Sequence, residues 1–318
     1  MSSISPDKTL RIAVISGGDS AEAEISRISG NGVLHALSQN YPLAVSFELD
    51  NHLTKALAIF NPDVVFPVLH GPPGEDGTFQ GFLEIQGYSY VGSDVRSSAI
   101  AMDKIVSKRI FASHGLPLAQ DIELNREDGI PHAIDRIKDT LGSQVVIKPA
   151  RQGSSLGVTL ISENYQLREA LETAFQFDEQ LLVEQRIRGK EMTVGVIDTD
   201  EGSQAFPIIE ITTPGNSWYD YEHRYTKGLS EHLIPADLTE AQSRRLPAIA
   251  IRAHQVLGCR DLSRADFIIT GNDMEYLLEV NTMPGMTPTS LYPDGAQAFG
   301  LGFEELMSHL VERAARRR

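Results

Sequence analysis

Four polar side chains that could hold a cation lie in two strand-like segments near the end of the chain. The segments, separated by a Gly-Asn-Asp turn, are residues 263–269 and 276–281. A turn centred between residues 272 and 273 places the polar groups on one face as two opposed pairs: Asp266 with Glu279, and Arg264 with Asn281. Side chains opposed in this way have Cβ atoms about 4.5–5.5 Å apart.

Two carboxylates held face to face repel each other, so a positive group must lie between them or one must be protonated. Oxygen ligands from Asp266, Glu279 and Asn281 suit Mg²⁺, which usually takes its remaining ligands from water and phosphate. The alternative is an exposed hairpin in which an arginine pairs with a carboxylate at the surface. We favour the metal–phosphate site, because both faces of the hairpin are expected to be buried. The second face is predicted to carry only apolar side chains: Ala265, Phe267, Leu278 and Val280.

A second group of residues is typical of phosphate binding. Lys148 ends a strand-like run and precedes a loop rich in glycine and serine, residues 152–157, whose backbone N–H groups could close over phosphates. The loop is not a Walker A motif, which needs a Gly-Lys-Ser/Thr ending and a following helix; a plain polar hairpin loop is the alternative. Lys104 opens a predicted helix, where a lysine is poorly placed against the dipole. A phosphate ligand or simple solvent exposure would explain it.

Further positions are compatible with ligand binding but are weak signals by themselves. Glu184 ends a strand and could accept a hydrogen bond from a ribose hydroxyl or face solvent. His70 ends a buried strand on the side of a parallel sheet where α/β proteins bind ligands, although a structural histidine explains it nearly as well. Gly285 could direct its N–H towards a developing oxyanion. Residues 212–234 form a long, aromatic and charged irregular stretch of the kind that often closes over a site.

The elements that must position these groups alternate between strands and helices in the first third of the chain. Strands are expected at residues 10–16, 44–48 and 64–69, and helical stretches at residues 20–37 and 78–86. This alternation indicates a parallel sheet flanked by helices. Gly17-Gly18 follows the first strand but lacks the full dinucleotide fingerprint, so an NAD site is not indicated.

A second unit begins near residue 97, and the pattern becomes rich in strands from residue 189. The expected elements of these parts are a helix (99–114), strands (144–149 and 158–161), a helix (165–175), strands (180–185, 193–198 and 204–211), a helix (240–257), the hairpin and a last helix (303–315). Boundaries near residues 92 and 185 divide the chain into three units.

Composition excludes some partners and compartments. The 318 residues are 41% apolar and 22% charged, which is ordinary for an enzyme of two or three domains. The net charge of −15 argues against nucleic acid as the main partner. The basic tail, Arg313 and residues 316–318, is expected to complement the dipole of a C-terminal helix. With one cysteine, no signal-peptide core and no run of ~18 apolar residues, we expect a soluble, cytoplasmic protein with no membrane partner.

Taken together, several motifs resemble those of one family of ATP-grasp enzymes. They span essentially the whole chain and are Gly17-Gly18-x-Ser20-Ala21-Glu22, Leu69-His70-Gly71, Gly74-Glu75-Asp76-Gly77-Thr78, Met102-Asp103-Lys104, Lys148-Pro149, Gly153-Ser154-Ser155-x-Gly157, Tyr219-Asp220-Tyr221-Glu222 and Glu279-x-Asn281-Thr282-x-Pro284-Gly285. The sequence resembles the D-alanine–D-alanine ligases. This resemblance implies an α/β fold of mixed α+β type, an ATP-grasp fold with an N-terminal, Rossmann-like domain built on a parallel sheet.

The resemblance also implies a division of labour along the chain. Residues 1–94 would form the substrate-binding domain, 95–185 the central ATP-grasp domain, and 186–318 the C-terminal ATP-grasp domain with the metal site and a lid at 212–234. ATP would lie between the last two, accompanied by two Mg²⁺ or Mn²⁺ ions. The residues implied to hold the nucleotide are Lys104, Lys148, Ser155, Glu184, which would bind the ribose, and Glu191 beside it. The implied metal ligands are Asp266 and Glu279 for one ion, and Glu279 and Asn281 for the other.

The implied reaction joins two D-alanines for peptidoglycan precursor synthesis. The γ-phosphoryl group of ATP would move to the carboxylate of the first D-alanine, and the amine of the second would attack the acyl phosphate. Closure of the lid would exclude water. At the first D-alanine, the resemblance implies that Glu22 with Ser154 and Tyr225 binds the ammonium group and that His70 lies beside the amino acid. It implies that Arg264 and the Gly285 N–H stabilise the oxyanion. Ser290 and the Leu291 N–H are implied to hold the carboxylate of the second D-alanine.

Two departures and two alternatives accompany the resemblance. Arg224 stands where relatives commonly carry lysine, and Gln185 stands where a lysine often flanks adenine. A ligase joining D-alanine to D-lactate or D-serine is one alternative; Tyr225 favours D-alanine, because depsipeptide-forming relatives replace it. A nucleotide-binding module without catalysis is the other, and the retained polar set of the hairpin argues against it. A homodimer is implied by the resemblance alone.

Overall fold

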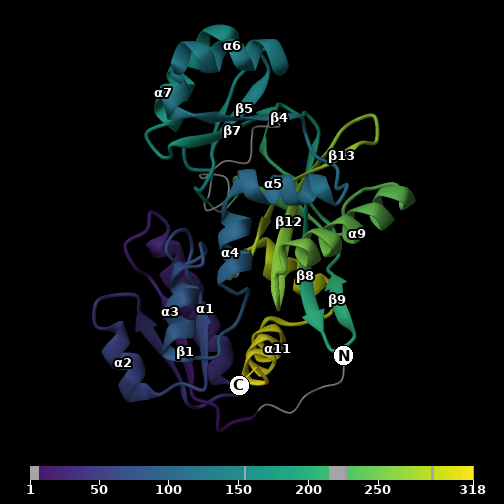
Figure 1. The fold of residues 1–318 in the computed structure, drawn as a ribbon. Helices are drawn as coiled ribbons and strands as arrows, with labels where there is room; N and C mark the ends of the chain where they lie inside the picture. The colour runs from purple at the N-terminus through teal and green to yellow at the C-terminus, as the bar shows by residue number, and fades with distance from the viewer. Residues whose placement is uncertain (1–6, 154, 215–225, 227, 288–289, 318) are drawn as a thin grey trace.

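Three sheets with helices packed on them build the computed structural model, which describes residues 7–153, 155–214, 226, 228–287 and 290–317 (Figure 1). Ser154, Arg224 and Tyr225, all named from the sequence, lie outside the described residues. Within these ranges, every helix is too short or too polar to span a bilayer.

The N-terminal sheet is parallel, as the sequence predicts. Its strand order is β2-β1-β3, from Ala44–Glu48, Ile12–Ser16 and Val64–Pro67. The helices of this unit are α1 (Ala23–Ser38), α2 (Leu53–Phe60) and α3 (Thr78–Gln86). Helix α2 is not predicted; it has only eight residues and buries only two of them, so its apolar periodicity is too brief to detect.

The central sheet forms the upper lobe of Figure 1 together with α6 (Ile130–Thr140) and α7 (Leu167–Ala174). Its antiparallel order is β4-β7-β5-β6, from Asp121–Asn125, Gln180–Gln185, Val145–Pro149 and Thr159–Leu160. The single helix predicted at residues 99–114 is wrong. Asp103 has an extended backbone (ψ 100°) and its side chain accepts hydrogen bonds from the N–H groups of Ile105 and Val106, which separates α4 (Val95–Met102) from α5 (Lys104–Ser113).

The C-terminal sheet has the order β11-β10-β8-β12-β13, with β9 paired to β8. Its strands are Glu231–Leu233, Ile209–Thr212, Lys190–Thr199, Leu262–Ile269 and Glu275–Asn281, and β9 is Gly202–Ala205. The strand predicted at 204–211 is wrong as one piece, because β9 and β10 are separate. Strand β11 falls within the stretch expected to be irregular. Helices α9 (Glu240–Leu257) and α11 (Phe303–Ala315) begin and end where predicted, whereas α10 (Leu291–Ala298) is not predicted.

Helix α11 joins the first and last parts of the chain in one apolar core. It packs on α1 and β3, and the same core includes buried side chains of the C-terminal unit such as Ile197, Leu262 and Tyr292. Helices α4 and α5 pack on α9 and β13, with Ala101 and Phe111 in the core of the C-terminal sheet. The division at residues 94/95 and 185/186 stays a prediction.

Candidate active site

The polar face of the β12–β13 hairpin forms in the register predicted from the sequence. Arg264 pairs with Asn281, and Asp266 pairs with Glu279. A β-bulge directly after Asp266 then shifts the register, so that Phe267 lies opposite Leu277. The prediction that Leu278 lies on the apolar face is therefore wrong.

The bulge changes which leucine faces the core. Leu277 is buried in the core of the C-terminal sheet, whereas Leu278 is half-buried and lines a large cavity. The face of the hairpin that lines the cavity therefore carries an apolar side chain, Leu278, beside the carboxylates, which simple alternation does not predict.

Asp266 is held by three neighbours. Arg264 Nε and Nη2 donate to its two carboxylate oxygens at 2.9 and 2.8 Å, and Thr193 Oγ1 donates at 2.6 Å. Asn281 Nδ2 donates to Oδ2 at 3.2 Å. The bidentate arginine places a positive charge against the Asp266 carboxylate and fixes its orientation.

The donor set of the hairpin fits a hard cation that brings further ligands with it. Among the described residues, no three His, Cys, Asp or Glu side chains gather as a ready metal-binding cluster. The hairpin instead offers two carboxylates and one amide, close enough for Asn281 to bond Asp266. Such a partial oxygen set matches Mg²⁺, which is commonly held by one or two carboxylates with phosphate and water completing the shell.

Lys104, which lines the large cavity, lies beside this hairpin. Lys104 Nζ lies 4.0 Å from Glu279 Oε2 and donates to the carbonyl oxygen of Gln152. Lys104 therefore lies between the hairpin and the loop at residues 152–157, where a phosphate chain would need a cation.

Glu184 is buried between two lysines rather than open to a ribose. Lys148 and Lys108 each form an ion pair with one of its carboxylate oxygens, and Lys108 also lies 3.2 Å from Asp121. Burial alone would raise the pKa of Glu184, but the two ammonium groups outweigh it and lower the pKa to about 2. The carboxylate is thus ionised and occupied, and it orients Lys148; its ribose role stays a prediction.

Lys108 is a functional candidate that the sequence argument missed. It is almost fully buried and lies on α5 four residues after Lys104. Residues four apart share a helix face, so this spacing was the available signal that a second lysine turns towards the same side.

The large cavity has a volume of about 1090 Å³ and lies between the central and C-terminal sheets. Most residues predicted to contact the nucleotide or metal line it: Lys104, Lys148, Ser155, Glu184, Glu191, Asp266 and Glu279. The size suits a nucleotide, because pockets for ligands of this class are typically ~300–1,000 Å³.

A smaller cavity of about 80 Å³ adjoins the large one, and Lys104 and Glu279 line both. The residues predicted to act on the amino acids that line it are Glu22, His70, Arg264 and Gly285, with Asn281 beside them. Its walls come from the N-terminal unit, from the central unit (Ala101, Met102, Lys104, Gln152 and Gly153), and from Arg264 with residues 279–285. A small ligand held here would touch all three.

Glu75 is a second candidate that was quoted in a motif but given no role. It lines the smaller cavity and accepts a hydrogen bond from the Gly71 N–H at 2.7 Å. Burial, and then the nearby Glu22 carboxylate, raise the pKa of Glu75 to about 8. Burial lowers the pKa of His70, and this effect outweighs the Glu22 carboxylate, which acts to raise it. The cavity therefore holds titratable groups whose charges respond to what binds between them.

Gly285 lines the smaller cavity, and Ser290 lies beside Gly285. A Cβ added at Gly285 would stand 2.8 Å from Ser290 Oγ, so only glycine permits this approach. The Ser290 hydroxyl accepts from the Thr287 N–H at 3.0 Å, and Ser290 precedes the first turn of α10. Ser290 and Leu291 are not among the described residues that line either cavity.

Comparison with known proteins gives consistent matches along the chain. The family model described as D-ala D-ala ligase C-terminus matches residues 110–312, and that described as D-ala D-ala ligase N-terminus matches residues 51–93. The D-alanine--D-alanine ligase of Syntrophobacter fumaroxidans is 42% identical over 308 residues, which are 96% of this chain and 97% of that protein. The D-alanine--D-alanine ligase of Geobacter sulfurreducens is 43% identical over 305 residues, 96% of this chain and 94% of that protein.

Solved structures agree with the sequence relatives. The D-alanine–D-alanine ligase from Bacillus anthracis complexed with ATP superposes with a TM-score of 0.82 at 30% identity, covering 97% of this chain and 98% of that chain. The D-alanine–D-alanine ligase from Coxiella burnetii gives a TM-score of 0.83 at 27% identity, covering 97% and 94%.

A nucleotide-sized cavity between two antiparallel sheets, with lysines on one wall and an acidic hairpin on the other, defines an ATP-grasp ligase. The predicted fold class is confirmed. The chain belongs to the D-alanine–D-alanine ligase family.

Proposed function

We propose that this protein uses ATP to join two D-alanines into D-alanyl-D-alanine, releasing ADP and phosphate, for peptidoglycan precursor synthesis. Family membership supports the reaction, and one structural observation carries it at this site. Lys104 and Glu279 line both the nucleotide-sized cavity and the smaller one, so the ends of two different ligands meet between them. A phosphoryl group can pass from one ligand to the other without leaving the protein.

The nucleotide would occupy the large cavity with its phosphates towards Lys104 and Lys148. Glu184 pairs with Lys148 and orients it, and Ser155 and Glu191 line the same space. Asp266, Glu279 and Asn281 would hold two Mg²⁺ or Mn²⁺ ions against the phosphates. Bound there, the ions would neutralise charge on the phosphate oxygens during phosphoryl transfer.

The first D-alanine would lie in the smaller cavity with its ammonium group at Glu22, where Ser154 and Tyr225 are proposed to complete a hydrogen-bonded set. Its carboxylate would then face the γ-phosphate across Lys104 and accept the phosphoryl group. This gives an acyl phosphate and ADP.

The second D-alanine would attack the acyl carbon with its neutral amine and expel phosphate. Arg264 is fixed by its bidentate bond to Asp266, which holds its positive charge in place to stabilise the oxyanion, with the Gly285 N–H proposed as a donor. Ser290 and the Leu291 N–H are proposed to hold the incoming carboxylate. Residues 212–234 are proposed to close over the site and keep water from the acyl phosphate.

A ligase that joins D-alanine to D-lactate or D-serine is the alternative within the family. ADP release measured with D-alanine alone, L-alanine, D-alanine plus D-lactate, and no amino acid distinguishes the cases. We expect release with D-alanine alone and background release with L-alanine or without amino acid. Release that is indifferent to D-alanine would refute the proposal, and release that needs D-lactate would support the alternative. Location in the cytoplasm and assembly as a homodimer are further proposals that rest on family membership.

A further inference from the structure

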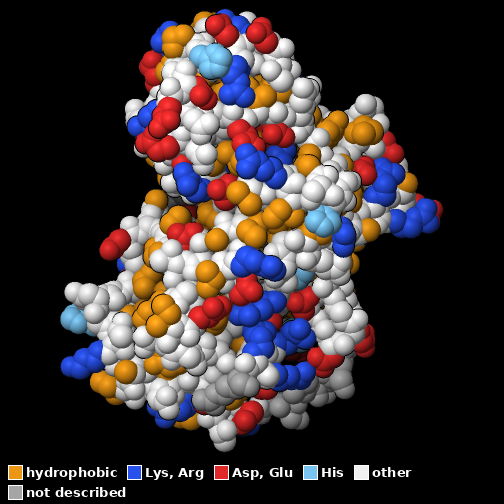
Figure 2. All heavy atoms as spheres, in the orientation of Figure 1, with side chains coloured by type: hydrophobic (Ala, Val, Ile, Leu, Met, Phe, Trp, Pro, Cys, Tyr) orange, Lys and Arg blue, Asp and Glu red, His pale blue; other side chains and the backbone are white. Residues whose placement is uncertain are grey.

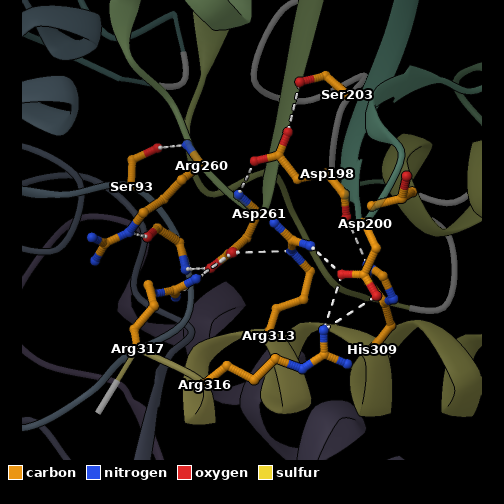
Figure 3. A network of polar contacts seen from close by, with 12 residues as sticks. Ser93, Asp198, Asp200, Ser203, Arg260, Asp261, His309, Arg313, Arg316 and Arg317 are labelled. Atoms are coloured by element: carbon orange, nitrogen blue, oxygen red, sulfur yellow. Dashed lines mark hydrogen bonds and ion pairs between the residues drawn. The ribbon is translucent and has the colours of Figure 1, made fainter. Parts of the chain in front are cut away.

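A fully buried carboxylate joins three segments of the molecule at the start of β12. Asp261 has no exposed surface and precedes Arg264 by three residues. Its two oxygens accept bonds from the two terminal nitrogens of Arg317 at 2.6 and 2.7 Å, and one oxygen also accepts the Gly92 N–H at 2.8 Å (Figure 3). Arg317 donates in addition to the Tyr90 carbonyl oxygen at 2.6 Å.

Asp261 is bonded to the N-terminal unit through Gly92 and to the segment after α11 through Arg317, and Arg313 Nε of α11 also lies 3.7 Å from Asp261 Oδ1 (Figure 3). Tyr90 and Gly92 belong to the N-terminal unit, because Tyr90 bridges to Val65 of β3. Arg317 follows α11, which packs on α1 and β3. Asp261 itself belongs to the C-terminal unit and is tied to β8, since its N–H donates to Asp198 Oδ2 at 2.8 Å.

Further bonds surround this interdomain joint, which we define as Tyr90, Gly92, Asp261 and Arg317. Arg260 Nε donates to the Gly92 carbonyl oxygen at 2.6 Å, and Arg260 lies over the Tyr90 ring. Figure 2 shows acidic and basic side chains gathered over the region where α11 and the C-terminus lie in Figure 1. Asp261 also holds φ at +66°, a left-handed conformation that is uncommon for residues other than glycine but that aspartate adopts more readily than most.

The interdomain joint touches the wall of the smaller cavity. A Cβ added at Gly92 would stand 3.1 Å from Met283 Cε, and Met283 lines that cavity. The cavity has Glu22 and His70 on its N-terminal side and Arg264 on the other, so its width follows the spacing of the two units. The large cavity lies between different elements, the central and C-terminal sheets, and the joint does not bridge them.

We propose that Arg317 is a positioning residue for the amino-acid site. By bonding both Asp261 and the Tyr90 carbonyl oxygen, Arg317 ties the N-terminal unit to the C-terminal sheet and so holds the distance from Glu22 to Arg264. The inference rests on the proposed function, which places D-alanine in the smaller cavity. Geometry matters here because a misplacement of about 1 Å by a remote mutation can cost ~10²-fold in rate.

The test compares Arg317→Met with Arg316→Met in the full chain. Arg316 is a matched control, because it pairs only with the exposed Asp200 at 2.9 Å among the contacts of the described residues. We expect Arg317→Met to raise the KM for D-alanine by ~10-fold while the KM for ATP stays within twofold, since only one cavity depends on the joint. Arg316→Met should change neither constant. An unchanged KM for D-alanine in Arg317→Met, or equal changes for both substrates, would overturn the inference.

Two further measurements keep the test decisive. Asp261→Asn retains an acceptor for the Gly92 N–H and should raise the KM for D-alanine in the same direction if Arg317→Met does not fold. Hydrogen–deuterium exchange should increase at residues 88–94 and 20–26 in Arg317→Met but not in Arg316→Met. Absence of D-alanine-dependent ADP release in the wild type would instead refute the proposed function, and the exchange result would still decide whether the joint holds the two units.

Discussion

Replacing Glu184 with glutamine should destabilise the protein, because it leaves two buried lysines without their shared counter-charge. Glu184 is 3% exposed, and the side chains of its partners Lys108 and Lys148 are 6% and 13% exposed. Glutamine keeps the size and a hydrogen-bond acceptor, so the change removes charge and little else. Asp121, at 3.2 Å, remains to pair with Lys108 alone.

The magnitude follows from the pKa of Glu184. The pKa falls from 4.5 to about 2 on folding, and at ~1.36 kcal/mol per unit this corresponds to about 3 kcal/mol in the free energy of unfolding. A loss of ~3–5 kcal/mol is also the usual result of removing one partner of a buried ion pair. The sign is set by the lowered pKa: the contribution is complete above pH 4.5 and is lost as pH falls towards 2, so about half remains at pH 3.

Urea unfolding of wild type and Glu184→Gln at pH 7 and pH 3 measures this directly. We expect the difference in unfolding free energy to be about 3 kcal/mol at pH 7 and to fall by about half at pH 3. The control is Glu172→Gln on α7, whose partner Arg168 lies 3.6 Å away in an exposed pair; it should change stability by less than ~0.5 kcal/mol. Equal losses in both variants, or a difference that does not shrink in acid, would refute the reasoning.

Three other predictions concern the two cavities. Glu279→Gln should lower turnover by at least ~10²-fold in an ADP-release assay with Mg²⁺. The control Glu275→Gln, at a residue that lines neither cavity, should not lower turnover. Full activity of Glu279→Gln would contradict the metal assignment. His70→Ala should raise the KM for the first D-alanine by ~10-fold with little change in kcat, and a selective loss in kcat would contradict a binding role. Glu75→Gln should gain thermal stability relative to wild type as pH rises from 5 to 9. Burial, and then Glu22, raise the folded-state pKa of the wild-type carboxyl to about 8, so ionisation of the unfolded chain above pH 4.5 favours unfolding of the wild type. A difference that is constant with pH would contradict the raised pKa.

The parts of the site that follow from alternation were predictable from the sequence. The register of Asp266 with Glu279 needs only a two-residue period and a recognisable turn, and it is confirmed. The bulge places Leu277, instead of Leu278, on the apolar face of the hairpin. The two-residue period does not reveal this shift, because both residues are leucine and either could fill that face. The parallel N-terminal sheet was equally accessible, since its strands β1 and β3 are short, buried and almost continuously apolar.

Contacts between segments distant in the sequence account for what was missed. Asp103 ends one helix and caps the next, and a continuous apolar pattern across it conceals the break. Lys108 and Glu75 acquire their roles only when Glu184 and Glu22, respectively, are brought beside them by the fold. No local pattern announces such a partnership, because charged residues on a helix or loop are usually solvated.

The central claim is that the carboxylate of the first D-alanine receives the γ-phosphoryl group before the second amine attacks. D-alanine labelled with ¹⁸O in both carboxyl oxygens, supplied with ATP and Mg²⁺, tests this in one mass spectrum of the released phosphate. We expect one ¹⁸O atom in each phosphate formed with the dipeptide, because the bridging oxygen of the acyl phosphate leaves with phosphorus. Phosphate free of ¹⁸O, formed together with D-alanyl-D-alanine, would contradict it.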